Sequence, residues 1–394
     1  MVLLLVIIYL AFISLGLPDS LLGSAWPSMY RSLGVSIDSA GIISVIVSAG
    51  TVISSLLSDR VIRRFGTGIV TSVSVAMTAV ALMGFSFSNN LFMVCVCAVP
   101  LGLGAGSVDA ALNNFVALHY KAKHMSWLHC FWGIGASLGP IVMSYYLVQT
   151  QSWNNGYRAI SILQFVLVAV LLFSLPLWKK AQSPANESEE TGRPSLTMKQ
   201  LIGLPGAKQV LLAFFSYCGI ESTVSLWGSS YLVTICGISA ATSARWVSLY
   251  FIGITFGRFL SGFLSIKLLH KQMIQLGQIL IGAGILVLFL PLQGYFALIG
   301  LFLIGIGLAP IYPSLIHETP INFGSQYSQS MIGLQMACAY VGTTLIPPLF
   351  GLLGVNMSYG LLPVFLGVLL LLMIFMVIQL YKQTSESNKE TGEG

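Results

Sequence analysis

Twelve long runs of apolar residues follow one another along the chain, and they restrict its fold more than any other feature of the sequence. Most of them reach the ~20 residues that a helix needs to cross the ~30 Å hydrocarbon core of a bilayer. Charged residues make up only 8% of the chain, whereas soluble proteins contain about 25%. Because backbone groups in lipid must bond within their own segment, the runs are predicted to be helices. They lie near residues 2–31, 36–58, 67–87, 91–119, 125–149, 158–178, 208–236, 243–266, 270–291, 293–317, 326–352 and 357–381.

One long polar stretch interrupts these runs, from Lys179 to about Lys208. Its proline, serine and glutamate residues are typical of a flexible linker. With six runs on each side, the sequence predicts an all-α membrane protein whose twelve transmembrane helices form two six-helix halves. Chains built this way bind their solute near the middle of the membrane, between the repeated halves. The predicted domains are residues 1–178, the linker 179–207, residues 208–381 and a polar tail 382–394.

Lysine and arginine are distributed unevenly over the loops between the runs. If the N-terminus faces the cytoplasm, only Arg31, Arg158 and Arg245 of the 18 lysines and arginines fall in outer loops, and Arg258 falls within a span. Cytoplasmic loops of membrane proteins carry such an excess. We therefore expect a cell-membrane protein with its linker and both termini in the cytoplasm. The net charge of +6 belongs to these loops and does not indicate nucleic acid binding.

Few ionisable side chains fall deep within the predicted spans: Asp19, Asp109, His129, Glu221 and Arg258. A charge at the bilayer centre costs about 2.5–3.5 kcal/mol on insertion scales, so such side chains usually serve a function. We expect the three carboxyl groups to couple transport to a proton gradient, because a carboxyl group in an apolar cavity can bind and release a proton. The alternative is a neutral acid that forms a structural hydrogen bond between helices. We expect Arg258 to pair with a carboxylate or with carbonyl oxygens, in gating or structure, and contact with the solute is the alternative.

Polar and aromatic side chains near these acids are candidates for the solute site. Helical spacing places Trp26 on the face of Asp19 and Asn113 on the face of Asp109. Aromatic rings beside a carboxylate suit a sugar, because the rings pack on its apolar face while the carboxylate binds hydroxyl groups. Ordinary core packing of the aromatic and histidine side chains is the alternative. The other candidates are His129, Trp227, Tyr231, Gln335 and Tyr312, which lies between two prolines that would break its helix.

The segment between the second and third spans reads SSLLSDRVIRRFG, and it resembles the loop signature of the major facilitator superfamily, Gly-x-Leu-x-Asp-Arg-x-x-Arg-Arg. In such a loop Asp59 can lie at the N-terminus of a helix of the other half, where the helix dipole favours a carboxylate. We therefore expect gating by Asp59, Arg60 and Arg64, and the alternative is that the basic residues only set the topology. The matching residues are Leu57, Asp59, Arg60, Arg63 and Arg64, while Ser55 stands where glycine is usual.

The fourth span is similar to a motif of the fucose–proton symporter family within that superfamily. Residues 104–115 read GAGSVDAALNNF, against Gly-x-Gly-x-x-acid-x-Ala-x-Asn-Pro-Phe in the family. Asp109 takes the position of the acid and Asn113 that of the asparagine, while Asn114 replaces the proline. The resemblance implies a role for Asp109 and Asn113 in sugar–proton symport.

Two further spans carry the same resemblance. The first span reads GLPDSLLGSAWP, with Asp19 at the place of that family's first-span acid. The fifth span reads WLHCFWGIGASLGP, with His129 and Trp132 where the family has polar side chains that contact the sugar. The resemblance therefore adds Trp132 to the predicted solute site.

These observations predict a secondary active transporter that carries a monosaccharide or a similar small polar solute together with a proton, by alternating access. Sodium is the alternative coupling ion, because carboxylate, amide and carbonyl oxygens suit hard cations. A proton-driven antiporter that exports drugs or amphiphiles is the alternative function, because Gly135, Gly139 and Pro140 match part of the antiporter signature Gly-x-x-x-Gly-Pro. A third alternative is a membrane sensor or lipid-handling protein on the same fold.

The sequence lacks the motifs that several classes of chemistry require. The sequence has no GxxxxGK[ST] loop for ATP, no Cys-x-x-Cys pair and no cluster with metal-ligand spacing. We therefore expect no enzyme activity, no metal and no cofactor beyond an ion gradient. The expected partners are a small solute and the lipid bilayer, with no nucleic acid, and the expected oligomeric state is a monomer.

Overall fold

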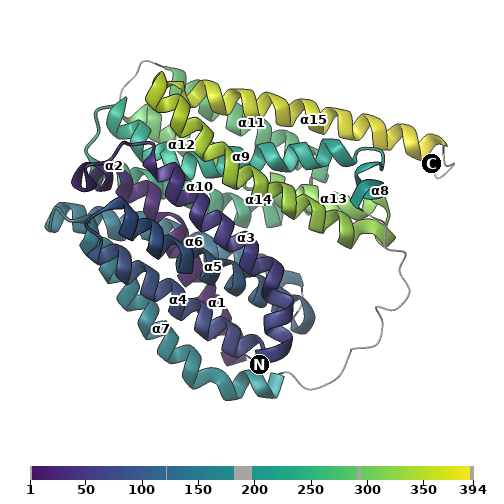
Figure 1. The fold of residues 1–394 in the computed structure, drawn as a ribbon. Coiled ribbons are helices and arrows are strands. Elements are labelled where there is room, and N and C mark those ends of the chain that lie inside the picture. The colour runs from purple at the N-terminus through teal and green to yellow at the C-terminus, as the bar shows by residue number, and fades with distance from the viewer. Residues whose placement is uncertain (1, 121, 182–197, 291–293, 391–394) are drawn as a thin grey trace. The chain divides into compact units, whose positions relative to one another are not determined.

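The structure is a computed structural model that describes residues 2–120, 122–181, 198–290 and 294–390, and every regular element within them is a helix (Figure 1). A short 3-10 turn at Tyr359–Leu361 accompanies the α-helices. The helices are α1 (Val2–Asp19), α2 (Leu21–Leu33), α3 (Ser39–Phe65), α4 (Thr67–Phe87), α5 (Leu91–His119), α6 (Ala122–Gln149), α7 (Trp153–Ala181), α8 (Met198–Ile202), α9 (Ala207–Thr234), α10 (Ala240–Leu264), α11 (His270–Phe289), α12 (Tyr295–Leu308), α13 (Ile311–Phe323), α14 (Ser325–Asn356) and α15 (Leu362–Glu390).

Eleven helical stretches of the described chain are long and apolar enough to cross a membrane. The predicted second span corresponds to α3 (Ser39–Phe65), in which Ser39–Ser55 forms a shorter apolar segment of the described chain. The prediction of an all-α membrane protein is thus confirmed.

Two of the predicted spans consist of two helices each. The first span divides into α1 and α2 at Ser20, and the tenth divides into α12 and α13 at Ala309 and Pro310. Pro18 and Pro310 lie at these breaks, where a missing backbone N–H and a bulky ring interrupt the helix. The break after α1 places Asp19 at the C-terminal end of that helix.

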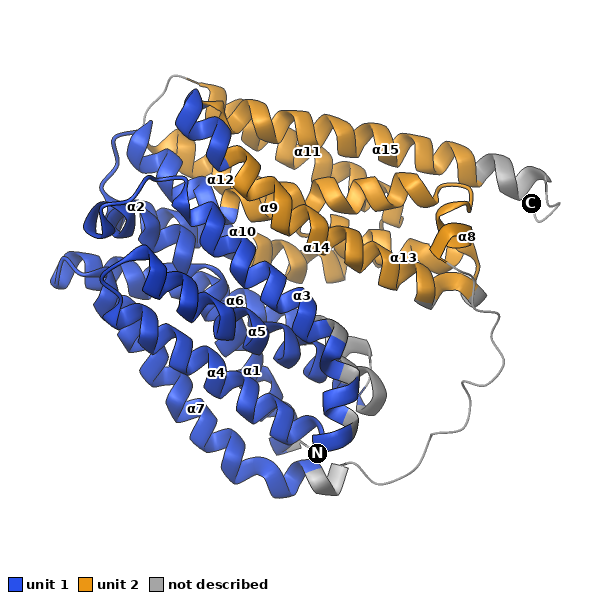
Figure 2. Cartoon of the chain, viewed as in Figure 1, with its two compact units in different colours: residues 1–184, 225–252, 351–360 blue, residues 185–224, 253–350, 361–394 orange. Residues whose placement is uncertain are grey.

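The chain forms two compact units (Figure 2). Unit 1 contains Met1–Pro184, Ser225–Ile252 and Gly351–Gly360, and unit 2 contains Ala185–Val224, Gly253–Phe350 and Leu361–Gly394. Helices α9, α10 and α14 therefore contribute residues to both units. The predicted domain boundaries stay a prediction, and residues 182–197 of the predicted linker lie outside the described residues.

Within unit 1, α1 packs directly against α6 through small residues. A Cβ atom added to Gly16 would lie 2.1 Å from the backbone oxygen of Trp132, and one added to Gly135 would lie 2.0 Å from that of Ile13. Only glycine permits so close an approach of two backbones. The contact fixes the distance between the helix that carries Asp19 and the helix that carries Trp132.

Substituting Gly135 with alanine is expected to force α1 and α6 apart and to lower the thermal stability of the purified protein. Overpacking of this kind typically costs about 1–3 kcal/mol. The matched control is Gly262→Ala in α10, where an added Cβ would meet nothing within 4 Å. The control should leave stability unchanged or raise it slightly, because alanine favours helix more than glycine does. Equal melting temperatures for the two variants would contradict the close-packing argument.

Candidate functional site

The first candidate residue, Asp19, is exposed although it lies at the end of α1 in a largely buried apolar stretch. Its Oδ2 accepts a hydrogen bond of 2.8 Å from the Nε1 atom of Trp132 on α6. Trp132 is half-buried, so part of this residue remains accessible. The sequence assigned Asp19 to proton coupling and Trp132 to the solute site, and the structure brings the two side chains into direct contact.

His129 lies one turn before Trp132 on α6 and is half-buried. Its ring meets Phe12 of α1 edge to face, with 6.0 Å between the ring centroids. Further along the same two helices, the Tyr9 hydroxyl and the Nδ1 atom of His124 share a hydrogen bond of 2.9 Å. The α1–α6 interface thus carries two histidines, of which the sequence analysis selected only His129.

Asp109 and Asn113 form the second polar pair of unit 1, on α5. The Asn113 Nδ2 atom donates to the Asp109 Oδ1 atom at 2.8 Å and to the Asp109 backbone oxygen at 3.0 Å. Both side chains are half-buried. The pair follows from the four-residue spacing that places both on one helix face. It provides a carboxyl group with a hydrogen-bond donor, and no ion pair of Asp109 occurs among the described residues.

Unit 2 contains the third carboxyl group, Glu221 of α9. Its Oε1 atom lies 3.5 Å from the Nη2 atom of Arg258 on α10, and the side chains are 22% and 17% exposed. Tyr217 lies one turn away from Glu221 and interacts electrostatically with both charges. The sequence left a carboxylate or carbonyl oxygens open as partners of Arg258, and in the structure the partner is the carboxylate of Glu221.

Tyr312 of α13 joins the aromatic side chains beside this ion pair. Its ring contacts Phe214 and Tyr217, with centroid distances of 5.5 and 5.8 Å, and its hydroxyl donates to the Met336 Sδ atom at 3.0 Å. The helix break at Pro310 precedes Tyr312 directly, as the sequence suggested. Unit 2 therefore combines a salt bridge with a group of aromatic rings.

Four other predicted solute residues are buried and serve packing in this structure. Trp26 is fully buried and donates to the Ile37 backbone oxygen, which ties α2 to the turn before α3. Trp227 is fully buried against Tyr359, with 5.5 Å between the rings, and Tyr231 is buried as well. Gln335 is fully buried and exchanges hydrogen bonds with Thr319 at 3.0 and 3.2 Å. These contacts match the packing alternative in the sequence analysis.

The predicted gating loop lies at the end of α3. Arg60 and Arg64 are exposed, and the Arg64 guanidinium lies 5.5 Å from the centroid of the Phe65 ring. The side chain of Asp59 lies outside the described residues. Ser55, which replaces the usual glycine, donates to the Gly106 backbone oxygen of α5 at 3.2 Å. The serine thus contributes a polar contact between α3 and α5.

Sequence reasoning missed one buried acid. The tenth predicted span ended at residue 317, but α13 continues to Phe323, so Glu318 lies within the helix and is only 8% exposed. Its Oε2 atom accepts a 2.6 Å hydrogen bond from the Tyr381 hydroxyl of α15. The expected list of deep ionisable residues was therefore incomplete, because the break at Pro310 restarts the helix. A search that began a new helix at that proline would have found Glu318.

Comparisons with known proteins agree with this architecture. The family model described as Major Facilitator Superfamily matches residues 8–317 and 211–394. A bacterial homolog of the human lysosomal transporter Spinster, solved in an inward-facing and unoccupied conformation, shares the fold with a TM-score of 0.71. The alignment covers 97% of this chain and 95% of that one at 12% sequence identity. The chain belongs to the Major Facilitator Superfamily, and it is accordingly a multi-pass membrane transporter and not an enzyme, as predicted.

Individual relatives include named sugar transporters. The glucose/mannose transporter GlcP of Bacillus subtilis (strain 168) is 24% identical over 356 residues, which cover 87% of this chain and 86% of that protein. The sodium-dependent glucose transporter 1 of Homo sapiens is 24% identical over 276 residues, which cover 61% of this chain and 52% of that protein.

Proposed function

We propose that this secondary transporter carries a monosaccharide or a similar small polar solute in symport with protons. The observation that carries the proposal is the hydrogen bond between the exposed carboxylate of Asp19 and the indole of Trp132. An ionised group that faced lipid at this position would be costly, so we infer that Asp19 faces water or solute. A carboxylate beside an indole can bind sugar hydroxyl groups and the apolar face of a sugar ring together.

The coupling groups in this proposal are the carboxyl groups of Asp109, Asp19 and Glu221. Asp109 is the best candidate of the three because its hydrogen-bond partner, Asn113, is neutral and can stabilise either protonation state. Glu221 has a fixed positive partner in Arg258, which favours its ionised form. We therefore assign proton uptake and release chiefly to Asp109, and we assign to Glu221 a state-dependent ion pair.

The relatives support sugar as the substrate class, because two of them are named as glucose transporters. The name of the human relative also makes Na⁺ the coupling ion to test against the proton. We further propose that the protein lies in the cell membrane with both termini in the cytoplasm, on the strength of its uneven distribution of lysine and arginine.

Uptake into proteoliposomes tests this function directly. The purified chain is reconstituted, and accumulation of labelled sugars is measured with an inward proton gradient, an inward Na⁺ gradient or no gradient. We expect accumulation of at least one monosaccharide that requires the proton gradient. If no sugar moves and cationic dyes are expelled, the symporter proposal is wrong and the protein is an exporter. If the Na⁺ gradient alone drives accumulation, the coupling ion is Na⁺ and not the proton.

Changing Trp132 to phenylalanine is expected to raise the KM for the transported sugar about five- to tenfold. The variant keeps an aromatic ring but removes the N–H that orients Asp19, and one hydrogen bond contributes about 0.5–1.5 kcal/mol. Counterflow at varied sugar concentration measures the effect. Trp127→Phe is the matched control, because Trp127 lies on the same helix and is 55% exposed. An unchanged KM for the Trp132 variant would remove this residue from the solute site.

A further inference from the structure

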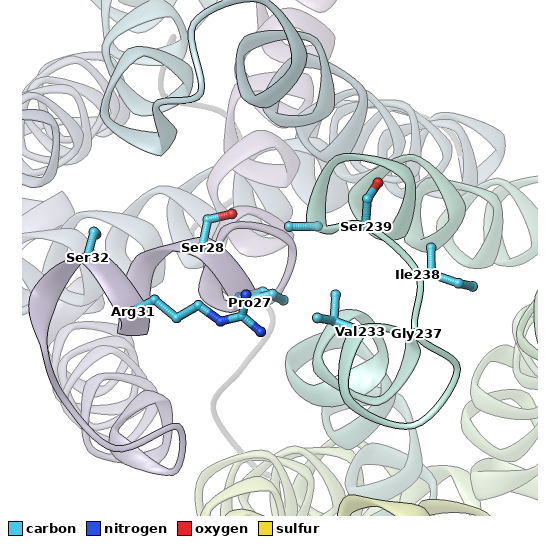
Figure 3. A pocket seen from close by; sticks show the side chains of 9 residues that line it. Pro27, Ser28, Arg31, Ser32, Val233, Gly237, Ile238 and Ser239 are labelled. Atoms are coloured by element: carbon cyan, nitrogen blue, oxygen red, sulfur yellow. The ribbon is translucent and has the colours of Figure 1, made fainter.

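A cavity of about 610 Å³ lies at the end of α2, within unit 1 (Figure 3). None of the residues assigned above to coupling or to the solute site lines it. One wall is the last part of α2, and the other is the end of α9 with the turn that leads to α10. The residues that line it are Pro27, Ser28, Arg31, Ser32, Val233, Gly237, Ile238, Ser239 and Ala240.

Two contacts within unit 1 hold the elements on both sides of this cavity together. A Cβ atom added to Gly23 of α2 would lie 2.1 Å from the backbone oxygen of Ser225 on α9, so these backbones touch. At the beginning of α10, the Ala241 backbone oxygen accepts a hydrogen bond of 2.7 Å from Ser144 of α6. The cavity is therefore bounded by packed helices of one unit.

The chemistry of the lining is that of an anion site with an apolar side. Arg31 is the single charged residue among the nine, and three serines accompany it. The Arg31 Nε atom donates to the Tyr30 hydroxyl at 3.0 Å, and the guanidinium lies 5.6 Å from the Tyr30 ring centroid. These contacts orient the side chain, which Figure 3 shows extending from α2 toward the opposite wall. Among the described residues, no carboxylate forms an ion pair with Arg31.

The opposite wall is largely apolar, and this limits the class of ligand. Val233, Ile238 and Ala240 present aliphatic side chains to the cavity, together with Pro27 from α2. A neutral sugar would leave the guanidinium without a charged partner. Inorganic phosphate would leave the aliphatic wall uncovered. A carboxylate attached to an apolar body satisfies both sides, because guanidinium and carboxylate groups form two parallel hydrogen bonds.

We propose that this cavity is an accessory site that binds a small organic carboxylate with an apolar body, such as an aromatic acid. The carboxylate pairs with Arg31, and the apolar body packs against Val233 and Ile238. The cavity volume falls within the ~300–1,000 Å³ typical of small-molecule sites. A bound acid contacts α2 and the α9–α10 turn at once. If these segments separate during transport, which rests on the proposed function, the acid slows transport without occupying the sugar site.

Benzoate is the probe for this site, and binding to the purified full-length chain in detergent is measured by calorimetry. We expect saturable binding to the wild type and an affinity at least tenfold lower for Arg31→Gln, because a charge-assisted pair is lost. Arg158→Gln is the matched control, since Arg158 is also exposed and stacks on a ring, Phe87, at 5.0 Å, but does not line the cavity. This control should bind benzoate as the wild type does.

Two further measurements separate the contribution of the charge to benzoate binding from that of the apolar contact. Benzamide, the neutral analogue, should bind at least tenfold more weakly than benzoate, and Val233→Ser should weaken benzoate several-fold while Arg31 stays in place. Equal benzoate affinity for the wild type and Arg31→Gln, or equal affinity of benzamide and benzoate, would overturn the proposal. Inorganic phosphate that binds as tightly as benzoate would overturn the assignment of an apolar body. If Arg31→Gln does not fold, two other variants decide the question. They are Arg31→Lys, which pairs with a carboxylate in a looser geometry, and Val233→Ser.

The transport measurement distinguishes this inference from the proposed function. Benzoate should lower the maximal rate of sugar counterflow without changing the KM for sugar. Competitive inhibition would place benzoate in the sugar site and overturn the accessory site. If the protein transports no sugar at all, the proposed function fails, and the binding measurements still decide whether the cavity takes the acid.

Discussion

Replacing Glu221 with glutamine is expected to abolish transport and to lower the stability of the protein by about 1–3 kcal/mol. The substitution leaves the guanidinium of Arg258 without its carboxylate, 3.5 Å away in the native protein. Breaking a fully buried ion pair costs about 3–5 kcal/mol, and we expect less here because the two side chains retain 22% and 17% of their exposure. Arg258→Gln should have a similar effect, because it leaves the carboxylate in the same apolar surroundings.

The double variant Glu221→Gln with Arg258→Gln separates the cost of an unpaired charge from the value of the pair. Removal of both charges should restore most of the lost stability, because two neutral amides can bond to each other. Transport should remain absent if the ion pair changes during the transport cycle. Thermal denaturation in detergent and counterflow in proteoliposomes measure the two effects. Additive losses of stability in the double variant would show that the two side chains do not act as a pair.

The fold could be predicted from the sequence because the bilayer imposes a length on every span. Charged residues near the ends of the runs gave the boundaries of most helices to within a few residues. Some helices continue beyond their predicted ends, as α3 does to Phe65 and α15 to Glu390. A different error occurs where proline restarts a helix inside one apolar run. The tenth run shows this, because α13 begins at Ile311 and extends to Phe323, which buries Glu318 where a loop was expected.

The polar contacts were predictable only where they are local in sequence or carried by the resemblance. Asp109 and Asn113 are four residues apart, so helical spacing was sufficient to pair them. Glu221 and Arg258 are 37 residues apart, and the sequence left open whether Arg258 pairs with a carboxylate or with carbonyl oxygens. Trp26 shares a helical face with Asp19 only in an unbroken helix, and the break at Ser20 removes that premise. The structure instead buries Trp26 and places Trp132 beside Asp19.

The substitution Asp109→Asn is expected to uncouple sugar movement from the proton gradient. Asparagine preserves the size of the side chain and a hydrogen-bonding oxygen for Asn113, but it cannot take up or release a proton. Accumulation driven by an inward proton gradient should fall at least tenfold, because a carrier without its proton site only equilibrates the sugar. Sugar-for-sugar counterflow should remain within a few-fold of the wild-type rate, since exchange does not require a net proton movement.

The matched control for this substitution is Asn113→Ala, which removes the amide that donates to Asp109 at 2.8 Å but keeps the carboxyl group. A carboxylate that loses a hydrogen-bond donor becomes less stable relative to its neutral form, so the control should remain coupled and work best at a higher pH than the wild type does. Proton-driven accumulation and counterflow, measured between about pH 5 and pH 8 on both variants, separate the two roles. Wild-type gradient dependence in Asp109→Asn would exclude Asp109 as the coupling group and leave Asp19 and Glu221 for that role. Loss of both accumulation and counterflow would assign Asp109 to solute binding, because a carboxylate needed only for protons is dispensable in exchange.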